Sequence, residues 1–262
     1  MRMRSAEYRK AVAPGPVKPY SSQFMPTSPN DKVAPIDPGT QPVAAIPEAE
    51  VAELPQNAPA AGPTPYPADE PPLAVDIDGT LIATDLFFEC AKAFALAEGP
   101  VGILTQSVQM AQVLRQGRPH LKRWLAEHLR LSLDDLPWQE HIVDFLRMEK
   151  ARGRRLILAT AADMLMARRI AERLGLFEEV IASRPGLNLK SHRKAEALVE
   201  LYGEGGFDYI GDARPDLKVW SHARRALVVS SRPAFIEQVR ELMGEDPARV
   251  RVFPSAMKFT AF

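Results

Sequence analysis

This chain of 262 residues has little cysteine, no net charge and no long uncharged run, and each of these absences argues against a class of structure or function. Its single cysteine, Cys90, rules out an internal disulfide and favours a reducing compartment. The chain has 33 lysine and arginine residues and 33 aspartate and glutamate residues, so its formal net charge is zero. It therefore lacks the positive charge that is typical of nucleic-acid-binding proteins. No window of eighteen residues is free of charge, so we expect no membrane-spanning segment. The charged start has no apolar run after it, so we expect a cytoplasmic protein, with a place at the membrane surface left open.

Proline is unevenly distributed, because 16 of the 24 prolines fall within the first 72 residues. Alanine, serine, threonine and glutamine surround these prolines, and aromatic residues are few there. Such a segment cannot bury enough surface to offset the entropy cost of ordering it. We therefore predict that residues 1–70 form a disordered tail with local polyproline II character.

From residue 73 onward, short apolar runs alternate with helix-like segments. This alternation predicts an α/β fold, in which helices cover both faces of a parallel sheet. Residues 86–150 instead have the pattern of several helices, so we predict a helical cap there, inserted into a core made of residues 71–85 and 151–262. The expected strands are 73–77, 155–160, 179–182, 207–210 and 226–230, the expected helices are 163–174, 192–202, 215–223 and 233–242, and the expected helix breaks in the cap are 99–100, 117–119 and 136–137.

Polar side chains follow several of the expected strands. Asp76 and Asp78 come directly after the first strand, Thr160 ends the second, and Asp212 follows the fourth. The ligand crevice of an open parallel sheet lies beyond the carboxyl ends of its strands. We therefore expect these groups to meet at one edge of the sheet, together with Lys190, which precedes an expected helix.

The order of these residues resembles the four motifs of the haloacid dehalogenase (HAD) superfamily. The resemblance covers residues 73–232 and implies a Rossmann-like core with a cap inserted after the first strand. The residues that carry it are Asp76-Ile-Asp78-Gly-Thr, Thr160 at the end of Leu-Ile-Leu-Ala-Thr, Lys190, and Gly211-Asp212-Ala-Arg-Pro-Asp216.

The resemblance implies hydrolysis of a phosphomonoester through an aspartyl phosphate. Asp76 would be the nucleophile, so that one difficult displacement becomes two easier ones. Asp78 would protonate the leaving oxygen and then activate the water that hydrolyses the intermediate. Lys190 and the Thr160 hydroxyl would hold the phosphoryl oxygens.

A Mg²⁺ ion is implied as well, because an anionic nucleophile repels an anionic substrate. By the same resemblance its ligands are the Asp76 carboxylate, the Asp78 backbone carbonyl and Asp212. Asp216 would lie just behind these ligands.

Each of these assignments has a structural alternative. Asp76 and Asp78 could form an acidic turn, and Asp216 could simply favour a helix amino terminus through the helix dipole. Lys194 competes with Lys190 for the role beside the phosphoryl group, and the spacing favours Lys190. The sequence leaves these alternatives open.

Shorter stretches are similar to the HAD-type domain fused ahead of some UbiA-type prenyltransferases, among them Asp85-Leu-Phe-Phe-Glu, Asn188-Leu-Lys190 and Phe207-Asp-Tyr-Ile-Gly-Asp. This likeness implies a prenyl or lipid-linked phosphate as a candidate substrate and a membrane prenyltransferase as a candidate partner. The apolar residues from Val101 to Leu114 would suit such a substrate, but a stripe of this kind is usually the core of the cap itself.

Two classes of function therefore remain. One is a Mg²⁺-dependent phosphatase acting on a small phosphorylated substrate. The other is a non-catalytic HAD-like docking or regulatory domain associated with a membrane prenyltransferase.

Overall fold

The computed structural model describes residues 15–16, 66–67, 69–128 and 131–256, with the backbone alone described for 15–16 and 97–109. The tail predicted for residues 1–70 thus lies almost entirely outside the described residues. Gly15–Pro16 form β1, which pairs antiparallel with the edge strand β4 (Glu179–Ser183). Tyr66 donates a hydrogen bond to Glu149, and Glu70 accepts one from Arg224, so both contact the core.

Six parallel strands make up the rest of the sheet in the described part of the chain, in the order β4-β3-β2-β5-β6-β7. The order reverses beside β2, which lies between β3 and β5. This is the doubly wound order of Rossmann-like folds, in which ligands bind outside the carboxyl ends of the strands at the reversal. The α/β fold predicted from the sequence is confirmed, and β7 is a further strand that the sequence did not predict. The strands are β2 (Leu73–Val75), β3 (Leu156–Asp163), β4, β5 (Asp208–Gly211), β6 (Ala226–Val229) and β7 (Val250–Phe253).

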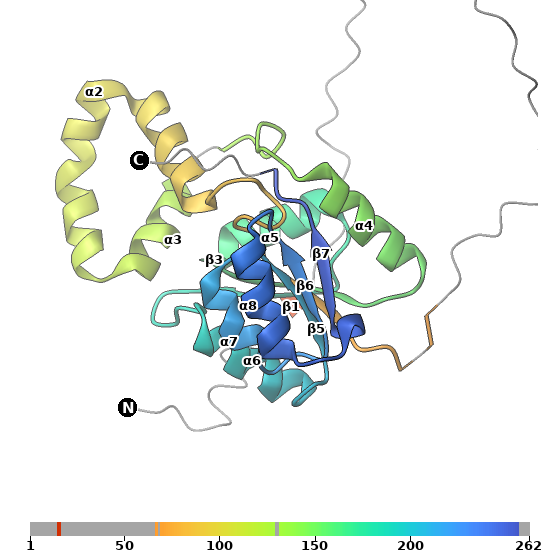
Figure 1. The fold of residues 1–262 in the computed structure, drawn as a ribbon. Coiled ribbons are helices and arrows are strands. Elements are labelled where there is room, and N and C mark those ends of the chain that lie inside the picture. The colour runs from red at the N-terminus through yellow and green to blue at the C-terminus, as the bar shows by residue number, and fades with distance from the viewer. Residues whose placement is uncertain (1–14, 17–65, 68, 129–130, 257–262) are drawn as a thin grey trace, which may run out of the picture. The chain divides into compact units, whose positions relative to one another are not determined.

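Helices cover both faces of this sheet (Figure 1). Successive strand residues point to opposite faces. Val75 and Leu158 accordingly belong to one core cluster, and Ala74 and Ala159 belong to the other. The first cluster is covered by α4 (Glu140–Ala151) and α5 (Met164–Leu174), and the second by α6 (His192–Tyr202), α7 (Leu217–Trp220) and α8 (Pro233–Met243); short 3₁₀ helices occupy Arg214–Asp216 and Pro247–Arg249.

The helices of residues 86–150 do not all belong to the cap, because one of them packs against the sheet. Helices α2 (Leu86–Arg115) and α3 (Arg118–His128) form a hairpin beside the sheet, in which α3 contacts β3 and α5 (Figure 1). Helix α4, which we predicted as part of the cap, packs beside β7, where the ring centroids of Phe145 and Phe253 lie 4.8 Å apart. It therefore belongs to the covering layer of the core.

The break predicted at residues 99–100 is wrong, because α2 continues through it. Figure 1 shows this helix bent rather than straight. A proline inside a helix removes one backbone hydrogen bond and kinks the helix, but the helix can continue beyond it. The helix therefore does not end at Pro100.

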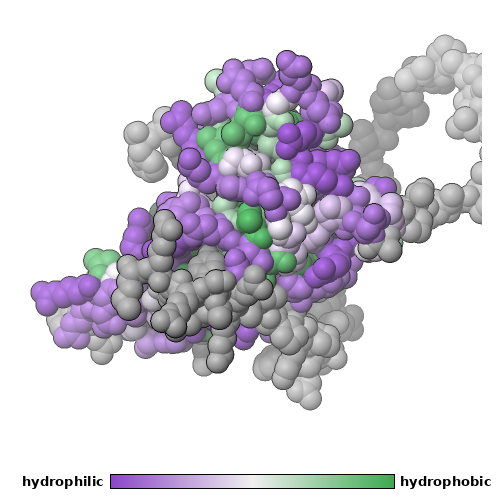
Figure 2. Space-filling view, turned by 90° about the horizontal axis from the view of Figure 1, so that it is seen from below, coloured by the Kyte–Doolittle hydropathy of each residue, from purple (hydrophilic) through white to green (hydrophobic). Residues whose placement is uncertain are grey.

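None of the described helices is both long and apolar enough to cross a membrane. Figure 2 shows a face on which hydrophilic residues predominate and hydrophobic ones form only small groups. The large apolar side chains that are most exposed among the described residues are Phe88, Leu96, Leu114, Met148 and Leu242.

Candidate active site

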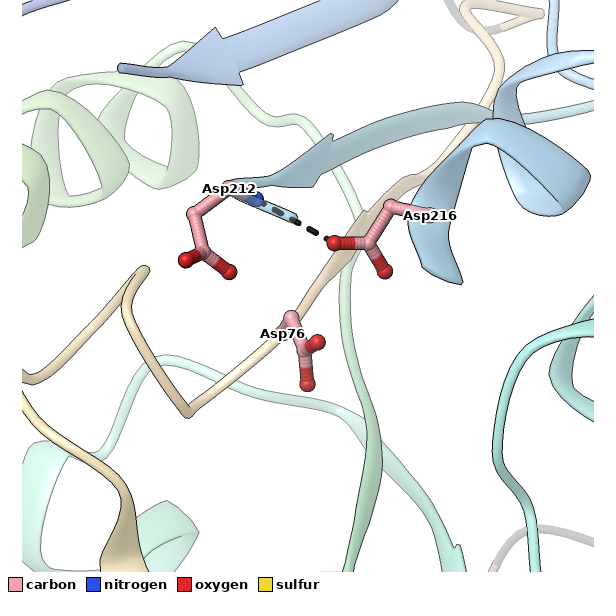
Figure 3. A group of neighbouring side chains, drawn as sticks. All are labelled: Asp76, Asp212 and Asp216. Atoms are coloured by element: carbon pink, nitrogen blue, oxygen red, sulfur yellow. Dashed lines mark hydrogen bonds between the residues drawn. The ribbon is translucent and has the colours of Figure 1, made fainter. Parts of the chain in front are cut away.

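Three carboxylates meet at the reversal of strand order. Asp76 follows β2, Asp212 follows β5, and Asp216 lies in the short 3₁₀ helix just beyond. Figure 3 shows the three side chains converging from these elements. Each offers an oxygen, and these oxygens all lie within 4.8 Å of one another. The sheet topology thus concentrates negative charge where a doubly wound fold binds its ligand.

Two glycines make this close approach of carboxylates possible. Gly79 has φ +70°, and a Cβ atom there would lie 2.0 Å from Oδ2 of Asp212. A Cβ atom on Gly211 would lie 2.8 Å from Oδ2 of Asp216. Only glycine tolerates the positive φ of Gly79, and only glycine leaves enough space for the carboxylates at the two positions. The glycines in Asp-Ile-Asp-Gly and Gly-Asp therefore shape the site as much as the acids do.

A buried lysine joins two of the carboxylates. The Lys194 ammonium, only 3% exposed, donates hydrogen bonds of 2.7 Å to Oδ2 of Asp76 and 2.7 Å to the Tyr209 hydroxyl. Tyr209 in turn donates a 2.7 Å hydrogen bond to Oδ1 of Asp216. Burial alone would lower the pKa of Lys194, but Asp76 and Asp216 outweigh it and raise that pKa. Lys194 is therefore held as a cation against Asp76.

The carboxylates of Asp212 and Asp216 differ in what they bind. Oδ2 of Asp216 accepts hydrogen bonds from the backbone amides of Asp212 and Ala213, at 3.2 and 3.1 Å, and Oδ1 accepts from Tyr209. The Asp212 carboxylate accepts no hydrogen bond from the described residues. Burial, followed by repulsion from Asp216 and Asp76, raises the pKa of Asp212 to about 8. A cation that binds oxygen would give the Asp212 carboxylate a partner and would reduce the repulsion among the three acids. These acids therefore fit a hard divalent metal.

Asp78 lies between the core and the cap. Its Oδ1 accepts a 2.7 Å hydrogen bond from the backbone amide of Leu86, at the start of α2. Burial, with Asp76 and Asp85 nearby, raises the pKa of Asp78 to about 7. A carboxylic acid with this pKa can exchange a proton near neutral pH, which is what general acid–base catalysis needs.

These groups open into one cavity of about 230 Å³ between the core and the cap. Ser191, in its wall, is the one described non-glycine residue with positive φ, at +55°. This tight turn separates Lys190, which is exposed at the cavity, from Lys194 inside the first turn of α6. The lining comprises Asp76, Asp78, Asp85, Phe87, Arg118, Pro119, Lys122, Ala161, Asn188, Lys190, Ser191, Lys194, Asp212, Ala213, Pro215 and Asp216.

Five of the six predicted site residues line this cavity, and Thr160 does not. Thr160 is fully buried, and its hydroxyl accepts a 3.1 Å hydrogen bond from the Ala162 amide, where the register of β3 against β4 shifts. Its predicted contact with a phosphoryl group stays a prediction. The lysine in contact with Asp76 is Lys194, which the sequence analysis placed second to Lys190.

Tyr209, Arg118 and Lys122 belong to this site but are not among the site residues predicted from the sequence. Tyr209 stands at an ordinary inward position of a strand, and only its hydroxyl distinguishes it from the apolar residues expected there. Arg118 and Lys122 could have been recognised from the sequence, because cations four residues apart share one face of a helix.

The family described as haloacid dehalogenase-like hydrolase matches residues 73–221. The uncharacterized protein y4nM of Sinorhizobium fredii is 37% identical over 176 residues, which are 65% of this chain and 32% of that protein. The chain thus matches only about a third of the length of this curated relative.

Two solved structures are similar at lower identity. A HAD family hydrolase from Salmonella enterica serovar Typhi is 17% identical, with 64% of this chain and 66% of that chain covered and a TM-score of 0.45. A phosphoserine phosphatase in its apo form is 15% identical, with 70% and 92% covered and a TM-score of 0.44. Likeness at this level carries no statement about substrate or metal.

Proposed function

Because this chain belongs to the haloacid dehalogenase-like hydrolase family, we propose that it is a Mg²⁺-dependent phosphatase that acts on phosphomonoesters. The observation that carries the proposal is the placement of Asp76. Its carboxylate lies in the cavity at the carboxyl end of the central strand, with the Lys194 ammonium on Oδ2. A carboxylate so placed can attack phosphorus and form an aspartyl phosphate.

Asp78 is the proton carrier of the proposed reaction. With a pKa of about 7, it donates a proton to the ester oxygen as the alcohol leaves. The resulting carboxylate then takes a proton from the water that attacks the aspartyl phosphate. Its hydrogen bond from the Leu86 amide fixes the carboxyl group at the amino end of α2 during both steps.

Mg²⁺ is proposed as the cofactor, held by the carboxylates of Asp76 and Asp212 with the Asp78 backbone carbonyl. The unbonded Asp212 carboxylate supports this, as does the raised pKa that its acidic neighbours cause. The bound ion would supply positive charge opposite the phosphoryl oxygens. Asp216, whose oxygens are both already bonded, orients the loop after β5 through the amides of Asp212 and Ala213.

The lysines have separate roles in this proposal. Lys194 holds and orients the nucleophilic carboxylate of Asp76 through its 2.7 Å hydrogen bond. Lys190, exposed in the cavity wall, neutralises the charge of the phosphoryl oxygens. The Thr160 hydroxyl, buried behind the cavity, is proposed to donate a hydrogen bond to one of them. Positioning and electrostatic stabilisation of this kind supply most of the catalysis in phosphoryl transfer.

A prenyl or lipid-linked phosphate is the candidate substrate that the sequence suggests, with a membrane prenyltransferase as partner. The partner is proposed from the sequence resemblance alone; in y4nM the matching segment is part of a longer protein of unassigned function. Of the apolar cap residues, Met110 and Val113 pack against the core cluster and Leu114 is 53% exposed. The stripe therefore serves at least partly as the core of the cap.

The proposal is tested by hydrolysis of p-nitrophenyl phosphate by the full chain, with Mg²⁺ and after addition of EDTA. We expect turnover that EDTA abolishes, and Asp76→Asn should lower kcat roughly a thousandfold or more, because the amide cannot form the covalent intermediate. The matched control is Asp134→Asn, which makes the same change on an exposed carboxylate paired with Arg173. This control should keep full activity.

Full activity of Asp76→Asn, with its fold checked by circular dichroism, would rule out this nucleophile. If the unaltered chain hydrolysed no phosphomonoester, the docking or regulatory class would take the place of the phosphatase. Binding of the chain to a membrane prenyltransferase would then be the decisive measurement.

A further inference from the structure

We infer that the cap side of the cavity binds a second negatively charged group of the substrate, next to the phosphate that is cleaved. This inference rests on the proposed phosphatase activity and narrows its substrate class. The substrate would be a phosphomonoester whose alcohol part carries a carboxylate or a phosphodiester.

The cap supplies the cations of this second subsite from one helix. Arg118 and Lys122 lie four residues apart on α3, so they share one face of that helix, and both line the cavity. The other cap residues in the lining are Phe87 and Pro119. The cap wall is thus a pair of cations flanked by two apolar side chains.

Both cations have bonding capacity left for a ligand. Arg118 is exposed and makes no ion pair with the described residues. The Lys122 ammonium donates one hydrogen bond of 2.8 Å, to the Ala161 carbonyl on β3, and forms no ion pair within 4.0 Å. An ammonium carries three donors and a guanidinium five, so the pair can bind one anionic group together.

Acids in the same cavity are engaged elsewhere. Asp85 caps α2 by accepting a 3.1 Å hydrogen bond from the Phe88 amide. Asp78 accepts from the Leu86 amide, and Asp76 from Lys194. Asp78 and Asp85 act electrostatically on Lys122, but among the described residues neither Arg118 nor Lys122 forms an ion pair with these carboxylates within 4.0 Å.

The direction of the substrate follows from the position of the nucleophile. Phosphorus must reach Asp76 in the core, so the alcohol part of the ester faces the cap wall. On the cap wall of this cavity of about 230 Å³, a prenyl chain would find only Phe87 and Pro119 as apolar neighbours. The adjoining apolar pocket, lined by Leu86, Cys90, Leu125 and Met166, has a volume of about 20 Å³, which is too small for such a chain. Ligand pockets are usually larger than this cavity and are lined mainly by apolar side chains. Because the cap wall is instead small and cationic, it favours a charged alcohol part over a prenyl chain. Of the two candidate substrates, a lipid-linked phosphate satisfies this condition where a phosphodiester joins the lipid to the phosphorylated alcohol part, and a prenyl monophosphate does not.

Matched substrate pairs test the inference with the full chain and Mg²⁺. The first pair is ethyl phosphate and 2-phosphoglycolate, which differ by a carboxylate. The second pair is ribose 5-phosphate and the same sugar with a methyl phosphodiester on C1. We expect kcat/KM to be about tenfold or more higher for the charged member of at least one pair, and the pair that responds identifies the group.

The variants Arg118→Met and Lys122→Met should each reduce that preference mainly by raising KM for the charged substrate. Arg115→Met is the control, because Arg115 is also an exposed cap cation but is not part of the cavity lining. This control should keep the preference unchanged.

Equal kcat/KM within both pairs would overturn the inference and leave the phosphatase proposal intact. A preference that survived in both variants would overturn it too. Absence of turnover with every substrate, p-nitrophenyl phosphate included, would refute the proposed function itself.

Discussion

At the scale of single residues, the hydroxyl of Tyr209 is the contact that the sequence least reveals. It accepts from Lys194 and donates to Asp216, so one buried oxygen fixes both an ammonium and a carboxylate. We expect Tyr209→Phe to lower kcat by about ten- to a hundredfold, because losing a hydrogen bond to a charged group costs about 1.5–3 kcal/mol. KM should change little, since Tyr209 does not line the cavity. Steady-state kinetics with p-nitrophenyl phosphate measures both constants.

The control for Tyr209 is Trp220→Phe. Trp220 is equally buried and donates a 3.0 Å hydrogen bond to the backbone carbonyl of Tyr209, but it does not touch Lys194. It should lower the free energy of unfolding while leaving kcat nearly unchanged. Equal losses of kcat in the two variants would mean that Tyr209 acts only through the packing of the core.

At the scale of elements, the sequence predicts most of the core because local periodicity and core burial agree there. Helix α6 begins and ends at the predicted residues, and four of the five predicted strands differ by no more than two residues at either end. Strand β3 runs three residues past the predicted end, to Asp163, with a register shift after Thr160. An irregularity of this kind depends on the neighbouring strand, so a single strand's sequence cannot reveal it.

The candidate site was predictable to the extent that it follows strand ends. Asp76 and Asp212 could be placed together because parallel strands present their carboxyl ends at one edge. The choice between Lys190 and Lys194 could not be made from spacing alone, since it depends on the turn at Ser191. The cap cations depend on how α3 packs over the sheet, which local sequence does not specify.

Asp163 links the cap to the core and starts α5. Its Oδ1 accepts a 2.8 Å hydrogen bond from the Leu165 amide, and its Oδ2 accepts one of 3.1 Å from Arg123 on α3. We expect Asp163→Ala to lower the free energy of unfolding by about 1–2 kcal/mol, because it removes the helix cap together with the contact to Arg123. Asp163→Asn keeps a capping side chain and should cost less. Urea unfolding of both variants checks this, and equal losses would exclude the capping role.

At the scale of the whole molecule, the groups that bind the strands together lie at the opposite end of the sheet from the site. Arg154 precedes β3, Asp208 begins β5, and Glu70 precedes β2. Arg154 hydrogen-bonds to Asp208, and its Nη1 donates to Glu149 at 2.8 Å. Arg224 adds hydrogen bonds to Asp208 and Glu70. Because this network is remote from Asp76, it can stabilise the sheet without taking part in the reaction.

Substitution of two adjacent arginines tests whether this network affects stability without affecting catalysis. Arg154→Met leaves the buried Glu149 without its closest cation and should lower the free energy of unfolding by about 3 kcal/mol. Arg155→Met removes only exposed pairs with Glu178 and Glu179 and should cost about 0–1 kcal/mol. In both variants kcat for p-nitrophenyl phosphate should match the unaltered protein under conditions where the chain stays folded. A selective loss of kcat in folded Arg154→Met would instead mean that the two ends of the sheet are coupled, and that the strands transmit changes in the network to Asp76.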